Sequence, residues 1–121
     1  MPYVDGFLIP VPKKKLAAYR KMAAKAGKIW MELGALEYRE CVGDDLKAKG
    51  MTGFATSAGA KASEAVIFSW IVYKNKAHRD RVNAKVMKDP RILKMMTQSP
   101  MPFDVTRMAY GGFKTIVDQS A

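Results

Sequence analysis

The chain has 121 residues, of which 49% are hydrophobic, and it carries a formal net charge of +10. This length and apolar content predict one domain, residues 1–121, with a sizeable core, and they exclude a disordered chain. A single cysteine, Cys41, excludes an internal disulfide and is typical of a reducing compartment. The first residues lack a signal peptide's basic region and apolar run, and no apolar stretch is long enough to span a membrane, so we expect a cytoplasmic protein.

The first part of the chain predicts a strand, a helix and a second strand. Residues 3–11 alternate as a strand does, and Pro10 and Pro12 are expected to end it. Asp5 lies on a face of this strand whose other residues are apolar. Residues 13–33 repeat apolar side chains every three or four positions, as an amphipathic helix does. Residues 35–41 alternate with mixed polarity, which predicts a less buried strand.

Residues 42–64 form a long connection rich in Gly, Ala, Lys and Ser. Connections of this length are uncommon in compact domains and often serve a function or an oligomer contact. Within this one, residues 51–56 are expected to form a short extended piece.

The stretch Val66–Tyr73 predicts a central strand because it is short and rich in β-branched and aromatic residues. Side chains alternate between the two faces of a strand. One face therefore carries Val66, Phe68, Trp70 and Val72, and the other carries Ile67, Ser69, Ile71 and Tyr73. Both faces are mostly apolar, so both require cover.

The last part predicts two helices and a final strand. Residues 76–88 predict the second long helix, and an Asp-Pro pair begins a short helix over residues 91–98. Residues 99–102, with two prolines, are expected to end it. Residues 105–113 predict the last strand, and the tail from about residue 114 is expected to be peripheral.

This order of elements is the ferredoxin-like β-α-β-β-α-β pattern, an α+β sandwich with two helices on one face of a mainly antiparallel sheet. The helices can cover only one of the two apolar faces. Two such sheets that pack face to face, as in a dimeric α/β barrel, would cover the other. We therefore expect a homodimer that forms through the sheet face.

Several stretches also resemble a known family. They are Met1–Phe7, Gly43–Asp45, Phe68–Ile71, Asp89–Arg91, Met101–Asp104 and Arg107–Phe113. Together they resemble the YbaA-like family of unknown function over almost the whole chain, with the segment from Leu46 to Ser63 less typical. The resemblance implies the fold of the dimeric α/β barrel proteins, which include small monooxygenases and stress-response domains, and it implies no particular activity.

The sequence contains no motif for a metal or a nucleophile. His78 and Cys41 are the only residues of their kinds, whereas zinc sites draw on several such ligands. Asp44 and Asp45 could hold a hard cation but equally suit an exposed turn. Ser69 lies inside a strand, not on an exposed elbow. We expect no metal and no cofactor.

A pocket is the better hypothesis for a site. Asp5, Trp70, Arg107 and Tyr110 come from three predicted strands and would form an apolar cavity with a few polar groups if they converged. Asp5 beside Arg107 would then be a charge pair in a low-dielectric environment. His78 could orient or activate a ligand at the rim, although a lone histidine more often simply packs. The same residues could instead be structural or belong to a dimer interface.

The first hypothesis for function is thus a small homodimeric protein that binds a small molecule in a barrel cavity. Cofactor-independent monooxygenase activity extends this hypothesis by fold analogy alone. The alternative is a non-catalytic structural or stress-related interaction protein.

Nucleic-acid binding is a third hypothesis, because basic side chains contact phosphates. The basic helix faces carry Lys21, Lys25, Lys28, Arg81, Lys85 and Lys88. Single-strand binders also expose aromatic side chains, whereas Trp30, Phe68 and Trp70 are expected in the core. A solvated charged surface is the simpler interpretation.

Overall fold

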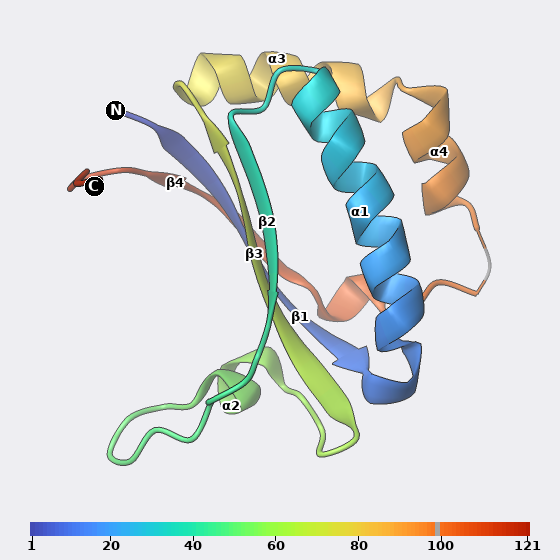
Figure 1. Ribbon diagram of the computed structural model, residues 1–121, viewed down its shortest axis with the longest axis vertical. Helices are drawn as coiled ribbons and strands as arrows, with labels where there is room; N and C mark the ends of the chain where they lie inside the picture. Colours follow the sequence, from blue (N-terminus) through green and yellow to red (C-terminus); the bar gives the residue numbers. More distant parts are fainter. Residues whose placement is uncertain (99) are drawn as a thin grey trace.

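The computed structural model describes residues 1–98 and 100–121, and its framework is a four-stranded antiparallel sheet (Figure 1). The strands lie in the order β2-β3-β1-β4, and every neighbouring pair is antiparallel. Their bounds are β1 (Tyr3–Pro12), β2 (Glu37–Val42), β3 (Glu64–Tyr73) and β4 (Ala109–Lys114). This arrangement confirms the predicted ferredoxin-like α+β fold.

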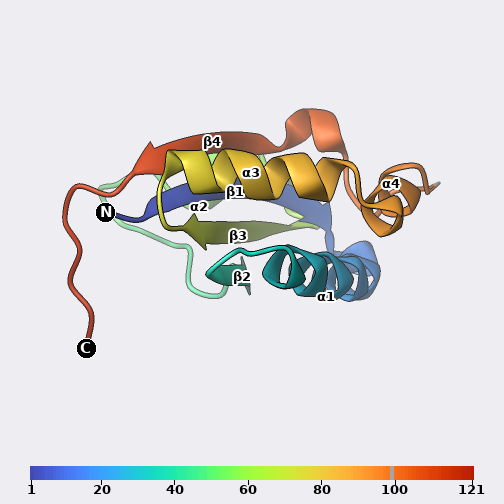
Figure 2. The same cartoon turned by 90° about the horizontal axis from the view of Figure 1, so that it is seen from above.

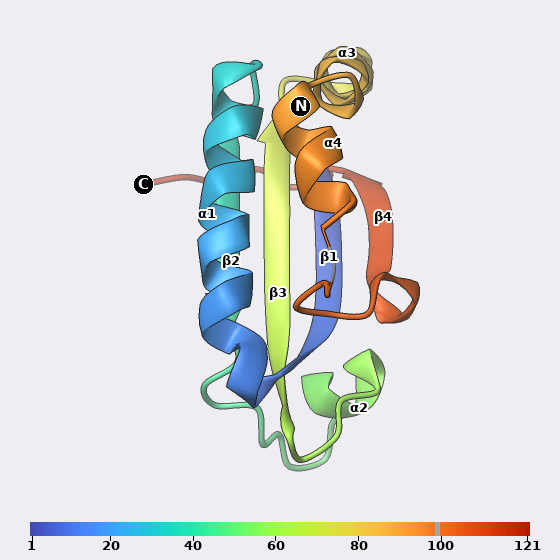
Figure 3. The same ribbon diagram turned by 90° about the vertical axis from the view of Figure 1, so that its right-hand side faces the viewer.

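Three α-helices cover one face of this sheet. A 3-10 turn, η1 (Lys13–Lys15), leads into α1 (Leu16–Glu32), and α3 (Lys76–Met87) and α4 (Pro90–Met96) follow β3. Figure 2 shows the sheet from its end with α1 beside β2, and Figure 3 shows α1 and α4 side by side in front of the strands. Asn75 and Asp89 cap α3 and α4, because each side chain accepts a backbone N–H of the following turn.

The two faces of the sheet have different surroundings. Opposed residues of antiparallel strands point to the same side, so the strand pairing assigns each residue to a face. The helix-covered face carries Tyr3, Asp5, Phe7, Ile9, Val11, Tyr38, Glu40, Ile67, Ser69, Ile71, Tyr73, Tyr110 and Gly112. The bare face carries Val4, Gly6, Leu8, Pro10, Glu37, Arg39, Cys41, Val66, Phe68, Trp70, Val72, Ala109, Gly111 and Phe113.

The core lies between the sheet and the helices. Ile71 and Tyr73 of β3 are 3% and 0% exposed and pack with Val82 and Val86 of α3 and Ile92 of α4. A second group packs beneath the first half of α1 and includes Ile9, Val11, Tyr19, Ala23 and Ile67. The apolar stripe of α1 thus buries the face of β3 that carries Ser69.

The expectation that Pro10 ends the first strand was wrong, whereas Pro12 is its last residue. β1 continues through Pro10, and Pro10 and Pro12 lie opposite Val66 and Glu64 of β3. β4 pairs with β1 only as far as Leu8. Beyond Leu8, β1 has a partner on one side only, so a residue without an N–H donor is tolerated there.

Two further expectations about local structure were also wrong. Residues 51–56 are not extended, because the connection instead forms a short helix, α2 (Phe54–Ala58). Its Phe54 ring lies 5.8 Å from the ring of Phe68 on the bare face. The last strand starts later than expected, because a 3-10 turn, η2 (Val105–Arg107), precedes it and the Asp104 side chain accepts the Thr106 N–H.

The segments around α4 and after β4 complete the chain. Ser99, one of the residues expected to end the short helix, lies outside the described residues. After Lys114 the chain has no regular structure, and Ile116 and Val117 are exposed as it leaves the sheet (Figure 1). Within residues 1–98 and 100–121, no helix is both long and apolar enough to cross a membrane.

Candidate ligand-binding site

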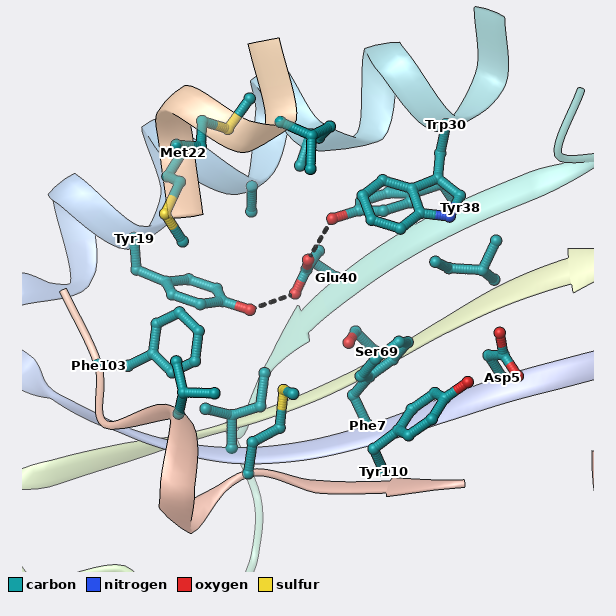
Figure 4. Close-up of a pocket in the computed structure, with 18 of the residues that line it drawn as sticks. Asp5, Phe7, Tyr19, Met22, Trp30, Tyr38, Glu40, Ser69, Phe103 and Tyr110 are labelled. Atoms are coloured by element: carbon teal, nitrogen blue, oxygen red, sulfur yellow. Dashed lines mark hydrogen bonds between the residues drawn. The ribbon is translucent and has the colours of Figure 1, made fainter. Parts of the chain in front are cut away.

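A cavity of about 470 Å³ lies between the helix-covered face and the helices above it (Figure 4). The strands form its floor, and α1, α3, α4 and the segment that leads into β4 form its walls. Six of the nine methionines line it: Met22, Met87, Met95, Met96, Met101 and Met108. Aromatic rings from Phe7, Tyr19, Trp30, Tyr38, Phe103 and Tyr110 complete most of the apolar lining.

Asp5 is the buried carboxyl of this cavity. It is only 1% exposed, because strand β1 is flanked on both sides and helices cover this face. Its Oδ1 lies 3.3 Å from Nε of Arg79 on α3, yet neither atom makes a hydrogen bond. A buried acceptor without a donor is costly and rare. The lining therefore contains one strong acceptor that the folded chain leaves unsatisfied.

The surroundings of Asp5 change its acidity. Burial raises the pKa of the carboxyl above its ordinary value, and the Arg79 charge and the side chains of Asn83, Tyr110 and Tyr73 offset this only in part. Burial also raises the pKa of Tyr110, and the Asp5 charge adds to the effect. Figure 4 shows the Tyr110 hydroxyl directed toward Asp5. Asp5 and Tyr110 thus form a pair of groups that hold their protons more tightly than usual.

Arg79 is held in place from behind the carboxyl. Its Nη2 donates to the Tyr3 hydroxyl at 3.1 Å, and its guanidinium lies 5.0 Å from the centre of the Tyr3 ring. Gly112 of β4 makes room for this arrangement, because a side chain there would meet Arg79 and the Tyr3 hydroxyl. Nη1 also contacts Asp80. These contacts fix the Arg79 side chain, but its Nε still makes no hydrogen bond to Asp5 Oδ1.

A second polar group forms where α1 crosses β2. The hydroxyls of Tyr19 and Tyr38 each donate to one oxygen of Glu40 at 2.7 Å (Figure 4). Burial, reinforced by the Glu40 charge, raises the pKa of both tyrosines, so both remain donors. Gly27 lets α1 approach, because a Cβ there would lie 2.6 Å from the Tyr38 ring. The helix and the strand together hold this carboxylate between two phenols.

Two of the predicted site residues meet at the cavity. Asp5 and Tyr110 both line it, from β1 and β4. Trp70 borders it along β3, but its indole belongs to the bare face, where Nε1 donates to Glu37 at 3.0 Å and Arg39 lies over the ring at 6.0 Å. Of the residues predicted to form the pocket, only Asp5 and Tyr110 therefore extend into the cavity from the same face.

His78 and Arg107 lie elsewhere. His78 Nδ1 accepts the Lys74 N–H at 3.0 Å, and its ring packs edge-on against Tyr73, so it closes the turn before α3. The predicted pairing of Asp5 with Arg107 was wrong. Arg107 lies in η2, outside the sheet, and its guanidinium binds Glu64 at 2.6 and 2.9 Å. Arg79 is the partner of Asp5.

Sequence reasoning missed Arg79, Asn83 and Glu40 as site residues. A helical spacing of three and four places Arg79 on the same face as Val82 and Asn83. This spacing could have indicated that Arg79 faces the core, but the other charged residues of the helix made it look like part of a solvated surface. Glu40 shares a strand face with Tyr38, and this alternation was visible in the sequence. In the part of the chain that the structure describes, no three His, Cys, Asp or Glu side chains gather as a metal site would require.

Solved structures of other proteins share this fold. An uncharacterized NIPSNAP domain protein from Burkholderia xenovorans superposes with a TM-score of 0.57 at 13% identity, covering 98% of this chain and 99% of the other. A dimeric ferredoxin-like protein from an uncultured marine organism gives a TM-score of 0.53 at 13% identity, with both chains covered completely. At these identities the likeness establishes the fold alone.

Sequence comparison identifies much nearer relatives. The uncharacterized protein YbaA of Escherichia coli K12 is 48% identical over 119 residues, which cover 98% of this chain and all of YbaA. YbaA of Shigella flexneri matches to the same extent. The family model described as a protein of unknown function, DUF1428, matches residues 2–105. The chain therefore belongs to the DUF1428 family, as its resemblance to YbaA-like proteins had indicated.

Proposed function

We propose that this protein binds a small, mainly apolar molecule in the cavity of the helix-covered face, with a hydrogen-bond donor of that molecule at Asp5. The observation that carries the proposal is the buried Oδ1 of Asp5, which lines the cavity and has no hydrogen-bond partner. A ligand hydroxyl or N–H would satisfy it. Monooxygenase chemistry rests on fold analogy alone, and the cavity supports only the binding step.

The dimensions and walls of the cavity agree with such a ligand. Its volume of about 470 Å³ lies within the range of roughly 300–1,000 Å³ that is typical of small-molecule sites. Methionine side chains are flexible and polarizable, so a wall rich in them adapts to ligands of irregular shape. The few polar groups among these apolar walls would orient the bound molecule.

A titration with 2-naphthol tests this proposal, because the probe joins an aromatic body to one hydroxyl donor. We expect saturable binding by calorimetry, weakened about tenfold in Asp5→Asn, because the amide that replaces the carboxyl is a weaker acceptor. Asp44→Asn, on an exposed loop, is the matched control and should bind normally. Thermal melting of each variant separates a lost contact from a lost fold.

A second pair of variants tests the location of the site. Ala26 lines the cavity from α1, whereas Ala18 is an exposed residue of the same helix. Ala26→Phe should fill the cavity and abolish 2-naphthol binding, and Ala18→Phe should leave it intact. Equal binding by both variants would place the probe elsewhere and overturn the proposal.

We also propose that the bare face is covered by a second copy of the chain. Phe68 and Phe113 on this face are 45% and 60% exposed. Its charged side chains Glu37 and Arg39 already pair at 3.3 Å. Among the described strand residues of this face, no cation is therefore left free for a phosphate, and the face suits an apolar partner better than a nucleic acid. The ferredoxin-like protein from an uncultured marine organism, which is described as dimeric, also supports a second copy as the partner.

Sedimentation equilibrium tests the dimer. The unmodified protein should sediment as two chains, and Phe68→Glu, which places a charge at the centre of the face, should sediment as one. Met51→Glu changes an exposed residue of the long connection and should remain dimeric. Unmodified protein that sediments as one chain, or that binds single-stranded RNA in a manner lost in Phe68→Ala, would contradict the proposal.

A further inference from the structure

The charges around the cavity indicate what kind of molecule fits it. Among the described residues, two carboxyl groups, Asp5 and Glu40, line the cavity, and no lysine does. Arg39 is the arginine among these lining residues, and its side chain is 59% exposed on the bare face. The protein has a net charge of +10, whereas the ionisable side chains that line the cavity are mainly acidic.

Glu40 is the carboxylate whose charge is not compensated. Asp5 has Arg79 beside it, whereas none of the ion pairs formed by the described residues includes Glu40. Its two oxygens each accept one tyrosine hydroxyl. A carboxylate oxygen can accept more than one hydrogen bond, so Glu40 is fixed in position and still has capacity for a further donor.

Aromatic rings surround this carboxylate. Tyr19 and Tyr38 hold it directly, Trp30 lies 6.1 Å from the Tyr38 ring, and Phe103 lies 5.5 Å from the Tyr19 ring. The faces of aromatic rings attract cations. A carboxylate among such rings is therefore suited to an organic cation, and less so to an anion.

We infer that the ligand is an apolar molecule with a protonated amine, whose ammonium group binds Glu40 between Tyr19 and Tyr38 while a second donor reaches Asp5. This inference deepens the proposed binding function and depends on it. An acid in the same place would meet two carboxyl groups, and Arg79, behind Asp5, is already engaged by Tyr3. The geometry thus selects an amine over an acid of the same shape.

The strand register gives the span of this ligand. Glu40 lies opposite Ser69, and Ser69 lies opposite Phe7, so these residues form one row across the helix-covered face (Figure 4). Two strand spacings separate the ends of the row by about 10 Å, and Asp5 is two residues along β1 from Phe7. Ser69, which is 4% exposed, lies between them. The ligand would therefore cross β3 with its polar ends on β1 and β2.

Three probes of one shape test the inference: 2-(2-naphthyl)ethylamine, 2-(2-naphthyl)ethanol and 2-naphthylacetic acid. The unmodified protein should bind the amine at least about tenfold more tightly than the alcohol, because the ammonium adds a charge–charge attraction to its hydrogen bond with the Glu40 carboxylate and the hydroxyl does not. The acid should bind most weakly. Glu40→Gln should bring the amine and the alcohol to similar affinities. Glu37→Gln makes the same change on the bare side of the same strand and should retain the preference.

The outcomes separate a failure of the amine inference from a failure of the proposed binding function. Equal or tighter binding of the alcohol or the acid overturns the amine class while the cavity remains a binding site. An amine preference that persists in folded Glu40→Gln removes Glu40 as its cause and overturns the inference. If neither these probes nor 2-naphthol bind, both the inference and the proposed function fail. The order of affinities in the unmodified protein decides the ligand class even if Glu40→Gln does not fold.

Discussion

The two faces of the sheet are similar in sequence and differ in what they bury. On β3, Ile71 and Ser69 are covered by helices and are 3% and 4% exposed, whereas Phe68 on the bare face is 45% exposed. The helix-covered face also buries Asp5 and holds Glu40 beside a cavity. On the bare face the Glu64 side chain is 7% exposed, but Arg107 satisfies it with two hydrogen bonds.

This difference between the faces agrees with the two roles that we propose for them. A face that only packs against a partner needs apolar area and few polar groups. A face that binds a small molecule retains polar groups whose hydrogen bonds are incomplete within the protein alone. The position of the unsatisfied Asp5 Oδ1 therefore separates the proposed ligand site from the proposed interface.

Neighbouring residues of β3 give the strongest test of this contrast. In the Phe68→Glu background, where a single chain is expected, Ile71→Ala should lower the free energy of unfolding by about 3 kcal/mol, because it opens a hole in a packed core. Val72→Ala, on the bare face, should cost about 1 kcal/mol or less. Urea unfolding measures both values, and equal losses would mean that the two faces are equally buried.

The titration of Asp5 gives a second, smaller effect. Burial raises the folded pKa above the ordinary value of 3.8, so the folded chain binds the proton more tightly than the unfolded chain. The contribution of Asp5 to the free energy of unfolding should therefore fall as the pH rises from about 4 through the folded pKa. Asp5→Asn cannot titrate, so its stability relative to the unmodified protein should improve over that interval.

Urea unfolding between about pH 4 and pH 8 checks this prediction, since the two curves should converge or cross as the pH rises. Asp44→Asn controls for the loss of one negative charge at an exposed position. A difference between Asp5→Asn and the unmodified protein that is independent of pH would mean that Asp5 titrates as in the unfolded chain.

The smallest effect concerns Arg107, which joins segments from the two faces at one end of the sheet. It binds Glu64 and the Gly59 carbonyl after α2, and its hydrogen bond lowers the pKa of Glu64 from 4.5 to about 2. The stability from this pair is present above the unfolded pKa of 4.5 and is lost as the pH falls through about 2.

Arg107→Gln should therefore reduce stability modestly at neutral pH and have little effect in strong acid. Arg107→Lys retains the charge but not the two-pronged contact, so it should recover only part of the loss. Thermal melts over a pH series measure both variants. A deficit of Arg107→Gln that grows on acidification would contradict this account of the pair.

Much of the fold could be predicted from the sequence because its elements follow simple periodicities. The alternation along β3 separated Ser69 and Ile71 from Phe68 and Trp70, and both sets were mostly apolar. For the same reason the sequence could not say which set the helices cover. The pairing of β4 only as far as Leu8, which makes Pro10 tolerable in β1, is a tertiary fact that local proline rules do not contain.

The candidate site could be predicted from the sequence only in part. Asp5 was identified because a carboxyl on an apolar strand face is unusual, and Tyr110 was identified beside it. Arg79 was missed because it lies in a run of charged residues that is typical of a solvated helix surface. Arg107 was paired with Asp5 because a strand was expected where η2 forms. Both errors concern long-range contacts, which residue spacing does not encode.

The methyl groups of the methionines test the central claim, that the helix-covered face holds the ligand site. Six methionines line the cavity, whereas Met1, Met31 and Met51 do not. With methyl-labelled methionine, addition of 2-naphthol should shift the NMR signals of cavity methyls such as Met22 and Met108. The signals of Met1, Met31 and Met51 should remain in place. Shifts confined to those three, or saturable binding that moves no cavity methyl, would contradict the account.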